Sequence, residues 1–148
     1  MGGRVVTTFQ TRRDIPAPPE QVFAAFSDPQ RLARWWGPAG FTNVFSVCEF
    51  KPGGKWSFVM HGPDRGHYAN ESVFAEIEPA RKVVVQHVSQ PRYVLTIALA
   101  PAADGTTVSW TQVFENPEVA RRIERIVVPA NEQNLDRLTR EVLSKGGA

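Results

Sequence analysis

The sequence has 148 residues, with 17 lysines and arginines against 15 aspartates and glutamates, for a formal net charge of +2. This length suits a single domain that needs no disulfide or metal, and the scattered, balanced charge gives no support for a nucleic-acid partner. Cys48 is the single cysteine, which excludes an internal disulfide. Because no stretch reaches the roughly 20 apolar residues of a membrane span, and no signal-peptide core is seen, we expect a cytoplasmic protein with no membrane contact.

The first predicted elements are a strand and two short helices. Arg4–Ile15 is rich in Val and Thr and alternates in part, which favours a strand, and the prolines that follow end it. A helix with apolar residues at helical spacing comes next. Asp28, followed by a proline, matches a helix cap with proline at the first helical position. The second helix would carry Trp35 and Trp36 and end at Gly37.

Six further strands are predicted between Phe41 and Phe114. Turn signals interrupt this segment about every ten residues, at Pro52-Gly53-Gly54, Gly62-Pro63-Asp64, Pro79-Ala80, Gln90-Pro91 and Asp104-Gly105. The connections are too short for helical crossovers, which excludes a parallel sheet. In two strands large apolar residues alternate with others, which indicates one buried face and one wetter face. They are Trp56, Phe58 and Met60 in one strand, and Tyr93, Leu95, Ile97 and Leu99 in the other.

The C-terminal segment has the pattern of a helix that covers this sheet. Asn116, followed by a proline, repeats the cap signal. Apolar residues then recur at helical spacing, at Val119, Ile123, Ile126, Val127, Leu135, Leu138 and Val142. We predict a short helix, a break or kink near Pro129, and a longer helix from about Ala130 to Ser144. The domain would span residues 4–144, with flexible termini at 1–3 and 145–148.

The width of this sheet leads us to expect an apolar cavity beneath the helix. Seven strands twist strongly, and one helix cannot fill their concave face with side chains alone. The chain has 4 Trp, 9 Phe and 2 Tyr, which either line such a cavity or simply fill the core. The expected lining is Trp56, Phe58, Met60, Trp110, Gln112, Asn131 and Leu135. A buried amide without a partner costs about 1–3 kcal/mol, so Gln112 and Asn131 must bond to each other, the backbone, water or a ligand.

Several segments together carry a resemblance to a known superfamily. The opening segment at residues 15–26, IPAPPEQVFAAF, resembles the START-like, or SRPBCC, superfamily. Its branch named for the activator of heat-shock protein 90 ATPase is matched by RWWGP at 34–38, PGGKWSFVM at 52–60, EIEP at 76–79 and LDRL at 135–138. The similarity runs from about Val6 to Leu143, and the motifs are specific in combination rather than singly.

The resemblance implies a Bet v 1-like helix-grip fold. This is an α+β fold with a seven-stranded curved antiparallel sheet, two short helices after the first strand, and a long C-terminal helix over the concave face. A deep apolar pocket between sheet and helix is also implied. No single activity is implied, because relatives include lipid and hormone carriers, polyketide aromatase/cyclases and chaperone activators. The WW-Gly-Pro and Pro-Gly-Gly motifs also have a purely structural explanation, in which the tryptophans anchor the short helices and the glycines make a tight turn.

Catalytic signatures are mostly absent from the sequence. It has no phosphate-binding glycine-rich loop and no G-x-S-x-G elbow. His61, His67 and His87 fit no metal-ligand spacing, so we expect no metal and no cofactor. His61 and His67 flank one predicted hairpin loop, where they could approach each other. Glu71 would serve as a base if it pointed into the cavity, where burial would raise its pKa, but the pattern of its strand does not fix its direction.

Three functions are compatible with these patterns. The favoured one is non-catalytic binding of a small apolar or aromatic molecule, by Trp35, Trp36, Phe41, Trp56, Phe58, Met60, Glu71, His87, Tyr93, Trp110, Gln112, Asn131 and Leu135. The second is an aromatase/cyclase- or dehydratase-like enzyme with a polar dyad drawn from His87, Glu71, Gln112 and Tyr93. The third is a co-chaperone that activates heat-shock protein 90. Exposed apolar residues on the outer sheet face would also favour a homodimer.

Overall fold

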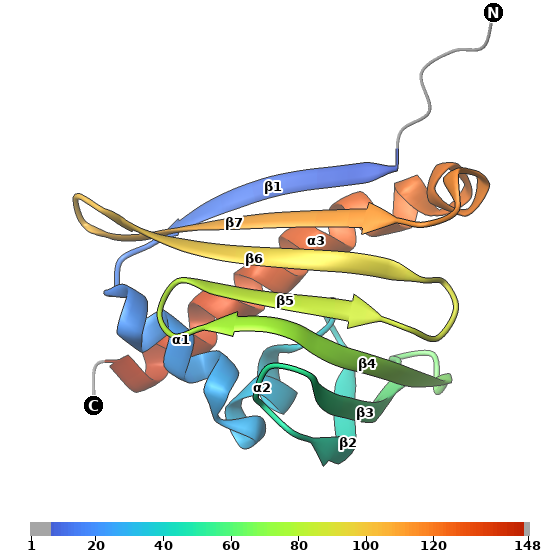
Figure 1. Cartoon of the computed structure of the whole chain (residues 1–148), viewed down its shortest axis with the longest axis horizontal. Coiled ribbons are helices and arrows are strands. Elements are labelled where there is room, and N and C mark those ends of the chain that lie inside the picture. The colour runs from blue at the N-terminus through green and yellow to red at the C-terminus, as the bar shows by residue number, and fades with distance from the viewer. Residues whose placement is uncertain (1–6, 147–148) are drawn as a thin grey trace, which may run out of the picture.

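The computed structural model describes residues 7–146 and shows a curved sheet that grips a long helix (Figure 1). The strands are β1 (Thr8–Ile15), β2 (Thr42–Cys48), β3 (Gly54–His61), β4 (His67–Glu78), β5 (Lys82–His87), β6 (Tyr93–Ala102) and β7 (Gly105–Phe114). They form one antiparallel sheet in the order β1-β7-β6-β5-β4-β3-β2. The predicted α+β helix-grip class and the seven antiparallel strands are confirmed. The predicted flexible residues 1–3, and residues 147–148, lie outside the described residues.

Two short helices lead from β1 to β2 and pack against the long C-terminal helix. They are α1 (Pro19–Ser27) and α2 (Pro29–Trp35). The predicted cap is present, because the Asp28 side chain accepts a hydrogen bond of 3.0 Å from the Gln30 backbone N–H. Pro29 then occupies the first turn of α2, where a missing N–H costs nothing.

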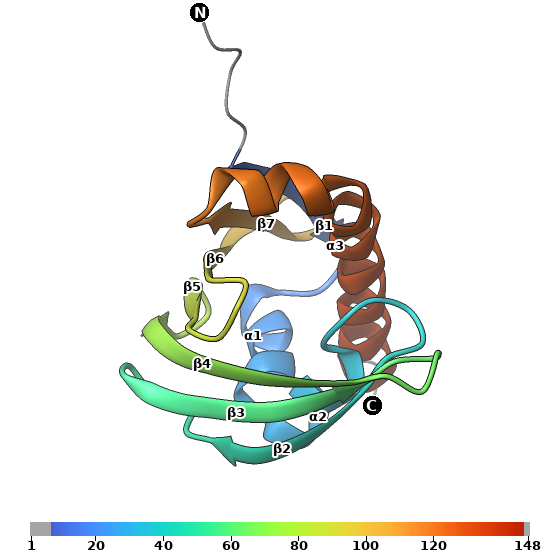
Figure 2. The same ribbon diagram turned by 90° about the vertical axis from the view of Figure 1, so that its right-hand side faces the viewer.

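The C-terminal helix α3 (Pro117–Gly146) is continuous and bent (Figure 2). The side chain of Asn116 caps it by accepting the Glu118 N–H at 2.9 Å. Pro129 lies inside the helix, and the first part of α3 runs across the end of the sheet while the rest turns down its open side. The expected break is therefore a kink, which proline causes by removing one N–H and crowding the preceding turn. The helix continues two residues beyond the predicted end at Ser144.

Polar contacts fix the second half of α3 to the edge strand β1. Arg13 Nη2 lies 3.0 Å from Glu132 Oε1, and Arg13 Nη1 lies 2.6 Å from Asp136 Oδ1. The Thr11 hydroxyl donates to the carboxylate of Glu132. The helix is thus tied to one edge of the sheet, which sets its path along the concave side.

In β3 and β6 the buried residues alternate with more exposed ones and lie on the concave face, as the alternation predicted. One cross-strand row of this face contains Trp56, Ser72, His87, Tyr93 and Phe114, which are paired in register across five neighbouring strands. Register shifts in β2 and β4 mark bulges, which bend a sheet locally. Within the described part of the chain, no helix is long and apolar enough to cross a membrane.

Candidate functional site

We call the space between the concave face of the sheet and α3 the grip. The residues that face it fall into two groups, one at each end. The tryptophan cluster consists of Trp35, Trp36, Trp56 and Trp110. The group that we call the polar end consists of Asn70, His87, Tyr93, Gln112 and Asn131. The two groups differ in burial, in polarity and in the part of α3 that faces them.

The tryptophan cluster is a packed core. The Trp36 ring lies 4.8 Å from Trp56 and 6.0 Å from Trp110 between ring centroids, and Trp35 lies 5.5 Å from Trp36. Trp56, Trp110 and the neighbouring Leu135 are at most 2% exposed, and Phe58 is 3% exposed. Such closely packed side chains leave almost no surface for a ligand. Although we predicted these four residues to line a cavity, here they fill the core.

Hydrogen bonding within the cluster is uneven. Trp35 Nε1 donates to the Ala25 carbonyl at 2.9 Å, which anchors α2 on α1. The indole nitrogens of Trp56 and Trp110 are buried and have no hydrogen-bond partner among the described protein groups. Each unpaired N–H costs stability, so the packing of these large rings must outweigh that cost.

Two α3 side chains form a clasp that holds the segment 34–41 in place, and we call this segment the tryptophan loop. The Arg137 guanidinium donates to five carbonyl oxygens, those of Arg34, Trp36, Gly37, Pro38 and Phe41, at 2.7–3.2 Å. Asn134 Nδ2 donates to the Trp35 carbonyl at 3.0 Å. These bonds satisfy the carbonyls at the end of α2, which would otherwise lack partners. The RWWGP and LDRL motifs are therefore in direct contact, and this contact is structural.

Two glycine positions show why the motifs have their sequence. Gly37 has φ +98°, and a Cβ there would lie 2.6 Å from the Met60 Cε. At Gly54 a Cβ would lie 1.9 Å from the backbone oxygen of Glu49. The first glycine supplies a left-handed conformation and the second a close backbone approach. The structural explanation offered above for the tryptophan and glycine motifs therefore accounts for both.

The polar end is organised around His87, which is 4% exposed on the concave face. Its Nδ1 lies 2.7 Å from the Pro91 carbonyl oxygen and its Nε2 lies 2.7 Å from Asn70 Oδ1. Ser89 Oγ lies 3.3 Å from Nε2. The ring stacks on Tyr93, with centroids 4.5 Å apart and planes 9° apart. A titratable group is thus held in one orientation by contacts on both of its nitrogens and on one face.

The surroundings of His87 determine its proton chemistry. A carbonyl oxygen only accepts hydrogen bonds, so Nδ1 carries a hydrogen toward Pro91. Burial lowers the pKa of His87, and the backbone hydrogen bonds at Pro91 and Ser89 oppose that shift. The stacked Tyr93 is neutral, because burial raises its pKa well above the ordinary value. In the neutral ring that burial favours, the hydrogen lies on Nδ1, and the lone pair of Nε2 faces Asn70 Oδ1, which is also an acceptor, at 2.7 Å.

An amide pair joins α3 to the sheet just beyond the kink. Asn131 Nδ2 donates to Gln112 Oε1 at 3.1 Å, which is one of the partners that the sequence allowed for these two inward-facing amides. Gln112 is 7% exposed, and Asn131 is half-buried. The first half of α3 packs its apolar side on Phe9 and Phe114 rather than on the tryptophan cluster. The polar groups thus lie where the helix changes direction.

The remaining predicted residues lie at the periphery of these groups. Met60 and Phe41 are half-buried near the tryptophan loop, where both border Gly37. Glu71 is exposed and accepts a hydrogen bond from the Ser57 hydroxyl on the convex face, so it does not join the polar end. This placement argues against the role of Glu71 as an internal base.

The other histidines and the cysteine form no second site. The rings of His61 and His67 lie 4.6 Å apart at the β3–β4 hairpin, as their flanking positions predicted. In residues 7–146, no group of three or more His, Cys, Asp or Glu side chains is placed to hold a metal ion. Burial raises the pKa of the Cys48 thiol to about 11, which makes it a poor nucleophile at neutral pH.

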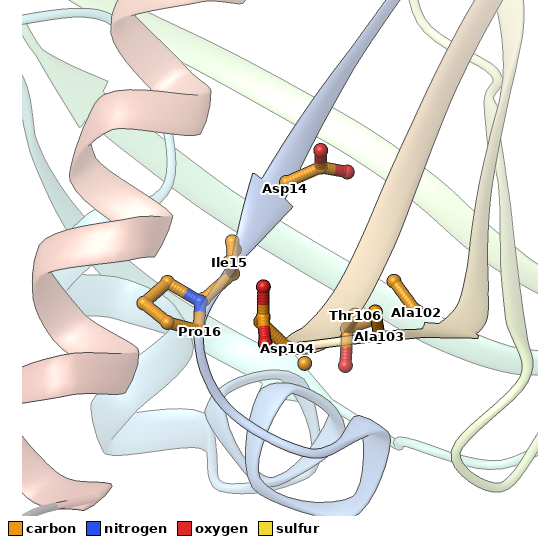
Figure 3. Close-up of a pocket in the computed structure, with 8 residues that line it drawn as sticks. Asp14, Ile15, Pro16, Ala102, Ala103, Asp104 and Thr106 are labelled. Carbon is orange, nitrogen blue, oxygen red and sulfur yellow. The ribbon is translucent and has the colours of Figure 1, made fainter.

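Several hollows occur on the outside of the grip. One of about 220 Å³ lies where β1 ends beside the β6–β7 hairpin, and Asp14, Pro16 and Asp104 border it (Figure 3). Another of about 240 Å³ lies at the ends of β5, β6 and β7, where His87, Arg92, Tyr93 and Phe114 are among the residues that border it. The first hollow contains no buried titratable group, whereas the second reaches the buried His87 and so belongs to the polar end.

Sequence reasoning missed the residues that hold this arrangement together. Asn70 and Ser89 set the environment of His87, while Asn134 and Arg137 clasp the tryptophan loop. A signal was present for Arg137, because this cation lies between Leu135 and Leu138, two residues of the predicted apolar face of the helix. No comparable signal marks Asn70, whose role depends on strand register.

Comparison with known proteins agrees with this fold. The family model described as "Activator of Hsp90 ATPase homolog 1-like protein" matches residues 16–142. Among functionally curated proteins no sequence matches. A crystal structure of a protein from Nitrosomonas europaea is 17% identical, with a TM-score of 0.86 over 96% of this chain and 97% of that one. One from Chromobacterium violaceum is 26% identical (TM-score 0.79, 89% and 94%), and an AHSA1-like protein from Aeromonas hydrophila is 19% identical (TM-score 0.72, 94% of each chain).

Proposed function

Because the chain belongs to the family of Activator of Hsp90 ATPase homolog 1-like proteins, whose SRPBCC fold is that of a ligand-binding domain family, we propose that it binds a small, largely apolar molecule at the polar end. The ligand would lie between the concave face and the kinked part of α3. The observation that carries this proposal is the placement of His87, Gln112 and Asn131 beside aromatic side chains of the inner face. A few convergent polar groups among aromatic side chains are typical of small-molecule sites.

The packing of the grip favours the polar end over the tryptophan end. Tyr93 and Asn131 of the polar end are half-buried, whereas the tryptophans are at most 5% exposed. A ligand reaches surface at the polar end without disturbing the core. The kink in α3 sets the position of its first half over this region, so the bend is part of the proposed site.

Binding is testable with a panel of small aromatic compounds. We expect a subset of naphthalene-sized compounds to raise the melting temperature and to appear as one-to-one complexes in native mass spectrometry. Asn131→Trp would occupy the site and abolish binding, whereas the matched change Arg125→Trp, on the exposed side of α3, would leave it intact. Equal binding by both variants would place the ligand elsewhere, and no binding by the native protein would refute the proposal.

Catalysis at the same place is the second candidate function, and His87 is the observation that favours it. Nδ1 of this buried imidazole is bonded to a carbonyl, and Nε2 would act as a base for enolisation or loss of water once a substrate displaces the Asn70 amide. A suitable probe is 4-hydroxy-4-phenylbutan-2-one, which loses water to give a strongly absorbing enone. Enone formation that His87→Gln removes while binding persists would support catalysis. Binding without turnover would leave the protein a binder.

A further inference from the structure

We propose that the molecule bound at the polar end is a small organic acid with an apolar body, and that its carboxylate binds together with one proton taken up on His87 Nε2. The inference rests on the proposed function, since it concerns the ligand of the same site. It adds the chemical class of the ligand and a coupling between ligand binding and proton binding.

The geometry around His87 is that of a ring with hydrogens on both nitrogens. Nδ1 faces the Pro91 oxygen and Nε2 faces Asn70 Oδ1, each at 2.7 Å. The orientation of the Asn70 amide is fixed independently, because its Nδ2 donates to the Tyr68 carbonyl at 2.9 Å. A neutral imidazole has one N–H and can satisfy only one of these acceptors. Both distances fit charge-assisted N–H···O bonds, which an imidazolium ring makes.

The protein by itself does not supply a negative charge to match such a ring. From β6, Tyr93 stacks on it in neutral form, and from β4 the Glu71 carboxylate points to the convex face and bonds to Ser57. Arg92, in the loop beside His87, lies 3.5 Å from Glu115 and also bonds to a backbone carbonyl. Burial accordingly lowers the pKa of His87. A site shaped for the protonated ring thus lacks the anion that would stabilise it.

A carboxylate ligand would complete this site. Among the cations at the grip, Arg13 is paired with two carboxylates and Arg137 is saturated by backbone carbonyls. His87 is therefore the group whose positive charge can attract an incoming acid, and because its two N–H groups are bonded to Pro91 and Asn70, the Ser89 hydroxyl beside Nε2 is the donor for the carboxylate. The aromatic rings of Tyr93 and Phe114, whose centroids are 5.3 Å apart, offer contact to the apolar body of the ligand.

The proton balance of the proposed step is simple. At neutral pH the ligand arrives as the carboxylate, His87 starts neutral, and the solvent supplies the proton that binds Nε2. No covalent bond of the ligand forms or breaks. The complex holds one more proton than the free protein. Between the pKa of His87 in the free protein and its higher pKa in the complex, affinity therefore falls about tenfold for each unit that the pH rises.

The test compares 2-naphthoate with 2-naphthamide, which has nearly the same shape and no charge. Calorimetry at pH 7.5 in phosphate and in Tris, buffers that differ in ionisation enthalpy, reports the number of protons taken up. We expect uptake approaching one proton for naphthoate and none for naphthamide, with only naphthoate binding more weakly as pH rises. Naphthoate binding without proton uptake would overturn the inference while leaving the proposed function intact.

Two further measurements identify the residue that takes the proton. His87→Gln should remove the uptake, whereas His61→Gln, a histidine at the β3–β4 hairpin, should retain it. Nitrogen NMR of the native protein avoids dependence on the folding of a variant, since Nε2 of His87 should change from an unprotonated to a protonated signal when naphthoate binds. An unchanged His87 signal in the complex would contradict the assignment. Failure of both naphthoate and naphthamide to bind would count against the proposed function and this inference together.

Discussion

The two ends of the concave face lie under the same helix and yet differ in residue type, in burial and in hydrogen bonding. At the tryptophan end four indole rings, Leu135 and Phe58 are packed together, and Arg137 and Asn134 bond the surrounding backbone carbonyls. At the polar end the helix bends, amides face inward, and a histidine has partners that only its protonated form can satisfy.

The contrast suggests that the two halves of α3 have different roles, one in stability and the other in ligand binding. The second half of α3 stabilises the fold through apolar burial and the clasp, whereas the first half covers Phe9 and Phe114 and leaves polar groups beneath the bend. A stable core at one end allows the other end to retain groups that are costly to bury. Substitutions at the two ends should therefore have different kinds of effect.

The largest effect on stability should come from emptying the tryptophan cluster. Trp56→Ala should lower the free energy of unfolding by about 3–5 kcal/mol, because it removes a fully buried ring and leaves a cavity. Tyr68→Ala, on the same face but 46% exposed, should cost less than about 1 kcal/mol. Urea denaturation followed by tryptophan fluorescence and circular dichroism measures both. Similar losses for the two variants would contradict the tight packing of the tryptophan cluster.

Removal of the clasp should have the next largest effect. Arg137→Met keeps the aliphatic stem and leaves five carbonyls short of a donor, so we expect a loss of about 2–3 kcal/mol in urea denaturation. Arg137→Lys should recover little of this, because an ammonium cannot reach the same spread of oxygens. The control is Arg140→Met, whose guanidinium is exposed and makes one bond of 3.5 Å. A full rescue by lysine would show that the positive charge, rather than the five hydrogen bonds of Arg137, holds the tryptophan loop.

The fold was predictable because its signals are local. Proline after Asp28 and after Asn116 marks two helix starts, turn residues mark the hairpins, and alternation in β3 and β6 marks the buried face. The kink at Pro129 follows from the chemistry of one residue. None of these inferences requires knowledge of which strands are neighbours.

The site was less predictable because its residues meet only through register. The contact of His87 with Asn70 depends on how β4 pairs with β5, and the β4 bulge shifts that pairing by one residue within the strand. The side on which Glu71 lies follows from the same register, which its own strand pattern does not reveal. The packing beside Trp56 was not predictable for a different reason, since periodicity identifies an inward face but not how tightly the opposing side chains fill it.

Glu141 provides a smaller test at the end of the helix farthest from the polar site. Its carboxylate is 8% exposed and pairs with Arg31 at 2.9 Å and Arg34 at 3.1 Å. Burial alone would raise the pKa of Glu141, but hydrogen bonds from both arginines outweigh it and hold the pKa below the ordinary value. Glu141→Gln should cost about 1–2 kcal/mol at pH 7, less than for a fully buried pair because Arg34 is 48% exposed.

The pH dependence of that variant follows from the lowered pKa. The stabilisation from Glu141 is complete above the ordinary carboxyl pKa of about 4.3 and is lost as the pH falls through the lower value of the folded protein. The native protein and Glu141→Gln should therefore converge in stability in acid, as urea titrations at a series of pH values would show. A constant difference down to the lowest pH would mean that packing, rather than the ion pair, sets the loss.

The smallest expected effect is the pH response of His87, which connects the polar end to stability. Because burial lowers the pKa of this ring in the folded state, the unfolded chain binds the proton more readily. Stability is then unaffected well above the ordinary histidine pKa of about 6.5, and it declines as the pH falls below that value until the folded ring also protonates. The slope from one such group cannot exceed about 1.4 kcal/mol per pH unit.

His87→Gln should flatten this decline, whereas His67→Gln, exposed at the β3–β4 hairpin, should not. Thermal or urea unfolding between pH 7.5 and 5.5 measures the difference, and identical profiles for the native protein and His87→Gln would show that the polar end accommodates the charged ring without help from a ligand.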